Sequence, residues 1–209
     1  MSVLSALPDL PDLASAQDLR RQRILAAARA CFSRQGFHGA TMGQICAEAA
    51  MSPGALYRYF PSKDAIIGAI AEEERVNAGA CMAALAGEGS LVDRMTAVAM
   101  DYLRGARDPE TGGLMVEICS ESLRNTAVGE RFHEIEHEVR DAFRAALVEA
   151  QVAGEISGDL DLDVVLMMVF AIGDGLQMRL ALEPDFAVER LETDLRRVLA
   201  ALFGLPRPC

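Results

Sequence analysis

Apolar residues recur at helical spacing through almost the whole chain, and no segment shows the alternation of apolar and polar residues typical of a β-strand. Stretches that contain glycine or proline interrupt the pattern and mark short connections between helices. We therefore predict an all-α fold of about nine helices. Their expected ranges are 16–35, 41–48, 52–59, 62–86, 90–107, 113–125, 128–153, 161–182 and 186–203.

Several predicted helices begin at a hydroxyl residue. Ser15, Thr41 and Ser90 are each followed three positions later by an acid or an amide, which is the spacing of a capping box. Ser52 and Ser62 precede further helical patterns and are expected N-caps. Helix ends are expected at glycine and proline positions, among them Gly36.

Charge is distributed unevenly along the chain, whose net charge is -11 over 209 residues. Residues 16–63 contain seven basic and two acidic side chains, giving 7 - 2 = +5, so the remainder is near -16. Such asymmetry indicates a basic module that approaches a polyanion, joined to an acidic body that does not.

The composition also indicates the cellular compartment in which the protein is expected. Five cysteines are widely spread and form no C-x-x-C pair, so we expect neither a disulfide framework nor a structural zinc site. Residues 1–15 alternate Leu, Pro and Asp, unlike a signal peptide, and are expected to form a disordered arm. The most apolar run, 164–172, is shorter than the roughly 20 residues of a membrane span. We expect a soluble cytoplasmic protein without a membrane partner.

Residues 41–60 have the spacing of a helix-turn-helix. In this motif the second helix enters the major groove of DNA with its N-terminal residues at the base edges. Here that helix opens with Ser52, Pro53, Gly54 and Ala55, which carry little side-chain bulk. The backbone of the helix can therefore come close to the DNA.

The rest of the second helix carries side chains suited to DNA. Leu56 and Phe60 are expected to face inward, leaving the three residues between Leu56 and Phe60 on the outside. Tyrosine hydroxyls bind phosphates, and arginine can pair with guanine at two points. Lys63, the chain's single lysine, lies in the first turn of the next helix and is expected to bind a phosphate.

The segment I-C-A-E-A-A-M-S-P-G-A-L-Y-R-Y-F-P-S-K, residues 45–63, resembles the DNA-binding signature of the TetR family of bacterial transcriptional regulators. The resemblance implies a homodimer that binds a palindromic operator in double-stranded DNA, usually as a repressor, and is released by a small-molecule effector. Ala50 departs from it, because the family commonly has glycine there. The DNA contacts implied are Thr41, Ser52, Pro53, Gly54, Ala55, Tyr57, Arg58, Tyr59 and Lys63, and Arg20 and Arg21 are possible additions.

These patterns divide the chain into an arm (1–15), a helix-turn-helix DNA-binding domain (16–63) and a helical ligand-binding and dimerisation domain (64–209). The predicted helix 161–182 is apolar almost all round, so it must be buried on more than one side. Pairing of this helix and 186–203 with a second copy would bury it. The interface residues expected are Val169, Gly173, Gly175, Leu195 and Leu199.

The effector is expected to bind in the helical body and to be lipophilic. Methionine adapts to irregular shapes, and carboxylates beside apolar segments could meet a cationic group of a ligand. Effector binding would shift the helix that begins at Ser62 and change the spacing of the two DNA-recognition helices. The candidate effector contacts are Met82, Met100, Met115, Glu117, Glu121, Met167 and Asp174.

One motif favours an enzyme instead. His133, Glu134 and His137 match H-E-x-x-H, in which two histidines bind zinc and the glutamate acts as base. Helical geometry places both histidines on the side of Arg140 and Arg144, whose charges oppose a metal. No H-x-x-G-x-x-H extension follows, and Glu155 is the only plausible later carboxylate nearby. We therefore expect no enzyme, metal or cofactor. A zinc hydrolase and a lipophile-binding module without DNA function are the alternatives.

Overall fold

The computed structural model describes residues 13–108 and 114–205. Within these residues it contains nine α-helices and one 3-10 helix and no strand, which confirms the all-α prediction. The elements are α1 (Leu13–Gly39), α2 (Met42–Glu48), α3 (Pro53–Tyr59), α4 (Lys63–Leu85), α5 (Leu91–Gly105), α6 (Leu114–Ser122), α7 (Thr126–Val152), α8 (Leu162–Leu182), η1 (Val188–Leu191) and α9 (Glu192–Leu202).

Side-chain caps form at most of the predicted helix starts. The hydroxyls of Ser52, Ser62 and Ser90 each accept a hydrogen bond from the backbone N–H three residues later. Ser15 is not a cap, because α1 already includes residue 13. The rest of the predicted arm, residues 1–12, lies outside the described residues.

The first helix ends in two steps. Gly36 has φ 70° and ψ 165°, a conformation outside the helical region that favours glycine, so the regular helix stops there as predicted. A further short helical segment runs to Gly39. This kink turns the segment 36–40 back toward α4 and α6, where its backbone is held by side chains described below.

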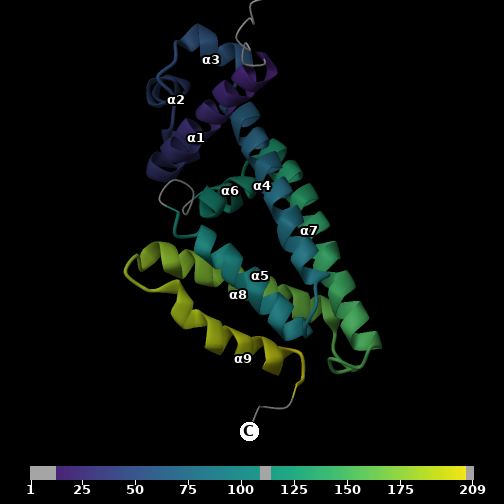
Figure 1. Ribbon diagram of the computed structural model, residues 1–209. Coiled ribbons are helices and arrows are strands. Elements are labelled where there is room, and N and C mark those ends of the chain that lie inside the picture. The colour runs from purple at the N-terminus through teal and green to yellow at the C-terminus, as the bar shows by residue number, and fades with distance from the viewer. Residues whose placement is uncertain (1–12, 109–113, 206–209) are drawn as a thin grey trace, which may run out of the picture.

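The helices form an elongated molecule (Figure 1). The short helices α2 and α3 lie with α1 at one end, and the long helices α4 and α7 run side by side away from them. The helices α5, α8 and α9 form the opposite end, and α6 lies between the two ends. Helix α9, the last described helix, is therefore far from the helix-turn-helix.

Buried apolar side chains form two separate cores. The first joins α1–α3 to the start of α4 as far as Ile70, and includes Leu114 and Ile118 of α6 and Val128 of α7. The second extends from Leu85 to Phe203 and joins α5, α7, α8 and α9. The division in packing thus falls within α4 rather than at its start, and α6 belongs to the core of the N-terminal end.

Candidate functional site

The helix-turn-helix is defined by reciprocal capping at its start. Thr41 Oγ1 accepts from the Gln44 N–H at 3.2 Å, and the Gln44 Oε1 accepts from the Thr41 N–H at 2.7 Å. The capping box predicted at this position is therefore present. It fixes the first turn of α2, whose buried Ile45 and Cys46 pack into the first core.

The turn between α2 and α3 places an alanine in the left-handed region. Ala50 has φ 48°, and it is the one non-glycine residue with a positive φ in the described parts of the chain. The Met51 N–H donates to the Cys46 carbonyl at 3.0 Å and the Ala50 N–H to the Ala47 carbonyl at 3.1 Å, which is a Schellman motif. Glycine is the usual residue at this position, so Ala50 holds the turn at a conformational cost.

The recognition helix α3 presents most of its expected residues to solvent. Ser52, Pro53 and Gly54 are exposed, and no atom lies within 4 Å of the position a Gly54 Cβ would occupy. Tyr57 is 51% exposed and lies beside the exposed Arg58. The opening of α3 is therefore open to a DNA groove.

Three further positions divide between the core and the surface. Leu56 and Phe60 are buried, as predicted. Tyr59 is half-buried and packs against the first core, which differs from the expectation that it projects outward. Three successive helical residues cannot all point away from a core. Of Tyr57, Arg58 and Tyr59, the first two are therefore the more exposed.

Lys63 has protein partners instead of an open position for phosphate. Its Nζ donates to the carbonyls of Phe37 and Ala40 at 2.7 Å and lies 3.5 Å from that of His38. The ammonium also lies 4.7 Å from the centre of the Phe37 ring. Its three donors are thus matched by the C-terminal carbonyls of α1, and a phosphate contact would have to compete with them.

Three of the other six basic residues of the N-terminal end are in ion pairs. Arg29 pairs with Glu73 and Glu74 of α4, and Arg21 lies 3.4 Å from Glu73. Arg34 pairs with Glu48 within the module, at 2.6 Å. Arg23 and Lys63 donate to backbone carbonyls, and among the described residues Arg20 and Arg58 have neither an ion-pair partner nor such a carbonyl contact. The cationic surface is therefore smaller than the local charge of +5 suggested.

Two carboxylates expected to bind an effector instead hold the end of α1. The Glu117 carboxylate accepts from the Phe37 N–H at 3.3 Å and packs against Gly36. Glu121 is only 3% exposed, and its Oε2 lies 2.9 Å from His38 Nε2. Both side chains come from α6, so this helix directly contacts the segment that leads to the helix-turn-helix. The sequence offered no signal for this contact between distant segments.

The methionines expected around an effector differ widely in burial. Met100 is buried in the second core, Met82 and Met115 are half-buried, and Met167 is 65% exposed on α8. A hollow between α4, α6 and α7 has a volume of about 40 Å³, much less than the roughly 300–1,000 Å³ of ligand pockets. Its lining includes Asp64, Ile67, Gly68, Ile118, Arg131 and Phe132.

Asp174 belongs to a polar cluster between α5 and α8. The Tyr102 hydroxyl lies 2.5 Å from Gln177 Oε1 and 3.4 Å from Asp174 Oδ1. Burial raises the pKa of Asp174, and the nearby Glu136 carboxylate adds to the rise, although the Tyr102 hydrogen bond opposes it. Burial also raises the pKa of Cys119 to about 11, with further contributions from the same two carboxylates. The cluster therefore places hydrogen-bonding groups in the helical body beside two acidic groups, Asp174 and Cys119, whose pKa values are raised.

The α8–α9 face differs from the predicted interface in its residues. Leu195 and Leu199 are 6% and 2% exposed and pack in the chain's own second core, so they cannot form a surface for a partner. Gly173 faces the Tyr102 ring, and Val169 packs against the same core, whereas Gly175 faces open space. The periodicity identified the apolar helices but did not distinguish their inner from their outer faces.

The outer face of these helices is apolar. The exposed large apolar side chains on α8 are Val164, Met167, Met168, Met178 and Leu182, and Val198 is exposed on α9. An open hollow of about 440 Å³ lies between the two helices, lined by Met168, Ala171, Ile172, Val198 and Leu202. Large apolar patches of this kind mark interaction surfaces.

Helix α8 also has the length and apolarity of a membrane span. Its 21 residues include a window of mean hydropathy 1.6, of which 22% is buried. The helix extends beyond the apolar run 164–172, through Gly173 and Asp174 to Leu182, so it is long enough to span a membrane. The apolarity of α8 needs an explanation that includes its exposed face.

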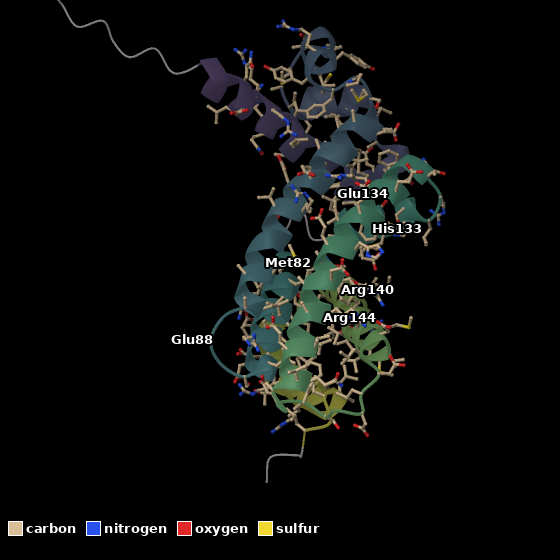
Figure 2. The ribbon with its side chains drawn as sticks, turned by 90° about the vertical axis from the view of Figure 1, so that its right-hand side faces the viewer. Met82, Glu88, His133, Glu134, Arg140 and Arg144 are labelled. Carbon is tan, nitrogen blue, oxygen red and sulfur yellow. The ribbon has the colours of Figure 1, made fainter. Side chains whose placement is uncertain are left out.

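The H-E-x-x-H residues lie on the surface of α7. His133, Glu134 and His137 are exposed, and His133 Nδ1 lies 3.5 Å from Glu136. Figure 2 shows His133, Arg140 and Arg144 following one another along the helix. No group of three His, Cys, Asp or Glu side chains suited to a metal occurs among the described residues.

Two family models match most of the chain. One, described as bacterial regulatory proteins of the tetR family, matches residues 24–70. The other, described as BetI-type transcriptional repressor, C-terminal, matches residues 91–204. The first match contains α2 and α3, and the second contains the complete outer face of α8 and α9.

Named relatives agree with these matches. UidR of Escherichia coli K12, an HTH-type transcriptional regulator, is 40% identical over 108 residues, covering 52% of this chain and 54% of UidR. The matched part thus spans about half the length of that relative. GusR of Salmonella enterica is 35% identical with a TM-score of 0.74, covering 89% of this chain and 96% of GusR. FadR of Bacillus subtilis, solved with stearoyl-CoA, has a TM-score of 0.72 over 85% of this chain and 96% of FadR; at 18% identity it shares the fold alone.

Proposed function

This chain belongs to the TetR family of bacterial transcriptional regulators, and from that premise we propose that it is a cytoplasmic repressor that binds a palindromic operator as a homodimer and responds to a small molecule. The family consists of regulators rather than enzymes, which answers the hydrolase alternative. The observation that carries the proposal is the exposed opening of α3, held by two caps and a tight turn.

Recognition of DNA is proposed to come from few side chains. Tyr57 and Arg58 are the exposed residues of α3 that can reach base edges or phosphates, and Thr41 lies exposed at the start of α2. Arg58 has no ion-pair partner among the described residues and is suited to two-point contact with guanine. Substitution of Arg58 is therefore expected to relax sequence preference as well as weaken binding.

Dimerisation is proposed to use the outer face of α8 and α9. A palindromic operator requires two recognition helices related by a two-fold axis, and a two-fold interface uses the same surface on both subunits. The exposed Met168 and Val198 beside the α8–α9 hollow supply such a surface. A second copy covering this face also accounts for the apolarity of α8 without a membrane.

The effector is proposed to be lipophilic and to bind in the helical body near Tyr102 and Asp174. The half-buried Met82 and Met115 provide adaptable apolar surface in that body. The FadR structure with stearoyl-CoA is a precedent for such a ligand in this fold.

Two routes connect the body to the helix-turn-helix. Lys63 links α4 to the end of α1 by hydrogen bonds. Glu117 and Glu121 link α6 to the same segment through Phe37 and His38. Movement of either helix would therefore displace the segment 36–40, which leads directly into α2. We propose that effector binding acts through both contacts, with a coupling free energy of about 1–3 kcal/mol typical of allosteric proteins.

The DNA-binding proposal is tested by selection from random double-stranded DNA. The purified protein is expected to enrich a palindrome, and Arg58→Ala is expected to lose it. Arg144→Ala is the matched control, because Arg144 is an exposed arginine on α7 away from α3 (Figure 2). Failure to enrich any sequence would favour the lipophile-binding module without DNA function.

The dimer is tested by sedimentation. Met168→Glu and Val198→Glu place a charge on the outer face and are expected to convert the dimer to a monomer. Val76→Glu is the control, because Val76 is 63% exposed on α4. A wild-type protein that sediments as a monomer at all concentrations would refute the proposed interface.

The route through α6 is tested by amide hydrogen exchange of residues 36–40. Glu117→Gln weakens the acceptor for the Phe37 N–H and is expected to speed exchange there and to alter operator affinity. Glu130→Gln, an exposed change on α7, is the control. Unchanged exchange and affinity would leave α4 as the sole connection.

A further inference from the structure

The guanidinium of Arg23 contacts the turn of the helix-turn-helix. Its Nε donates to the Ala49 carbonyl at 2.7 Å and its Nη2 donates to the Ala50 carbonyl at 2.9 Å. Arg23 lies on α1, 26 residues before Ala49 in the chain. Two adjacent carbonyls of one turn are therefore held by a single planar side chain from another helix.

These two carbonyls are ones that the turn itself leaves unsatisfied. The Schellman bonds use the carbonyls of Cys46 and Ala47, while those of Ala49 and Ala50 lie beyond the last bonds of α2. A cation at the C-terminal end of a helix is also favourable for the helix dipole. Arg23 thus completes the hydrogen bonding of the turn immediately before Ser52, the N-cap of α3.

The contact occurs where the backbone is under strain. Ala50 adopts φ 48°, which is unfavourable for a residue with a Cβ. Without an external restraint, the turn could relax toward other conformations and change the angle of α3. Two charge-assisted hydrogen bonds to the residues at and before the strained position oppose this relaxation.

We propose that Arg23 is a positioning residue for DNA recognition: it fixes the turn and hence the orientation of α3, instead of serving mainly as a phosphate contact. The inference rests on the proposed DNA binding through α3. One of the seven basic residues of the N-terminal end thus acts through the shape of its guanidinium as well as through its charge.

Substitution by lysine separates the two roles. Lysine keeps the charge, but its ammonium cannot reproduce the planar fork that spans two carbonyls. Arg23→Lys is therefore expected to lower operator affinity about three- to thirtyfold, the effect of losing one or two hydrogen bonds, with an unchanged salt dependence. Near-normal affinity of Arg23→Lys would overturn the proposal.

Substitution of Arg23 by glutamine tests whether its side chain contacts a DNA phosphate. A lost phosphate contact lowers the slope of log affinity against log salt concentration by about one. Arg23→Gln is expected to lose affinity without that change in slope, whereas Arg58→Ala serves as the reference for a side chain at the DNA surface. A slope reduced by about one in Arg23→Gln would show that Arg23 contacts phosphate.

Rescue at Ala50 provides the decisive arm. Ala50→Gly removes the strain, so it is expected to restore at least half of the lost binding free energy in the Arg23→Lys background. Ile24→Val, a truncation of a fully buried neighbour, is the control for general destabilisation and is expected to leave affinity unchanged when the protein is fully folded. Absence of rescue would contradict the assigned role.

A measurement without DNA separates this inference from the proposed function. Amide exchange of Ala50 and Met51 is expected to be faster in Arg23→Lys than in the wild type. If the wild-type protein binds no operator, DNA binding through α3 fails whatever the exchange shows. If the operator is bound but exchange at the turn is unchanged, only the positioning role of Arg23 is refuted.

Discussion

Replacing Ala50 by glycine is expected to stabilise the protein, although glycine usually weakens helical structure. The left-handed conformation costs an alanine about 1–2 kcal/mol, and Ala50 has φ 48°. Glycine removes this cost but loses about 0.5–1 kcal/mol through the greater freedom of the unfolded chain. With the middle of each range, the net gain in the free energy of unfolding is about 0.75 kcal/mol, or about 1.5–3 °C in Tm for a chain of this size.

The same substitution three residues earlier is the matched control. Ala47 is exposed and lies within α2, where glycine is unfavourable by about 0.5–1 kcal/mol. Thermal unfolding followed by circular dichroism should therefore shift upward for Ala50→Gly and downward for Ala47→Gly. A lower Tm for both variants would refute the argument that the turn holds its alanine under strain.

Three further predictions concern the helical body. Gly129→Ala is expected to destabilise the protein by more than about 2 kcal/mol in chemical denaturation, because the added Cβ would lie 2.6 Å from the backbone oxygen of Ser122. Leu199→Ala is expected to cost about 2–5 kcal/mol by opening a cavity in the second core, whereas Leu123→Ala, at an 82% exposed position, should change the free energy of unfolding by less than about 0.5 kcal/mol. Burial raises the pKa of Cys119 to about 11, so its thiol is protonated at pH 8, and peptide mapping should show slow alkylation that accelerates as the pH rises toward that pKa.

Local patterns were sufficient where neighbouring residues act on one another. The caps at Thr41, Ser52 and Ser62 form because a hydroxyl three residues before a backbone N–H can reach it in any helical start. The stop at Gly36 follows from backbone freedom that only glycine has at no cost. The motif itself was recognisable for the same reason, since its helices and turn are adjacent in the chain.

Partners distant in the chain could not be predicted in this way. Lys63 was expected to bind phosphate, yet its ammonium lies on the carbonyls that end α1. Glu117 and Glu121 were expected to bind an effector, yet α6 turns both toward the end of α1. A charged side chain on a helix surface carries no information about which distant helix will meet it.

The sequence by itself determined the all-α fold, the helix-turn-helix and the family, because helical period, capping and turn chemistry are properties of neighbouring residues. Only the tertiary structure decided which face of each helix is buried, so that Leu199 belongs to the core while Val198, the next residue, is exposed on the outer face. It likewise placed Arg23 against the turn at Ala50. Both outcomes depend on how distant helices pack, which the period of one helix does not specify.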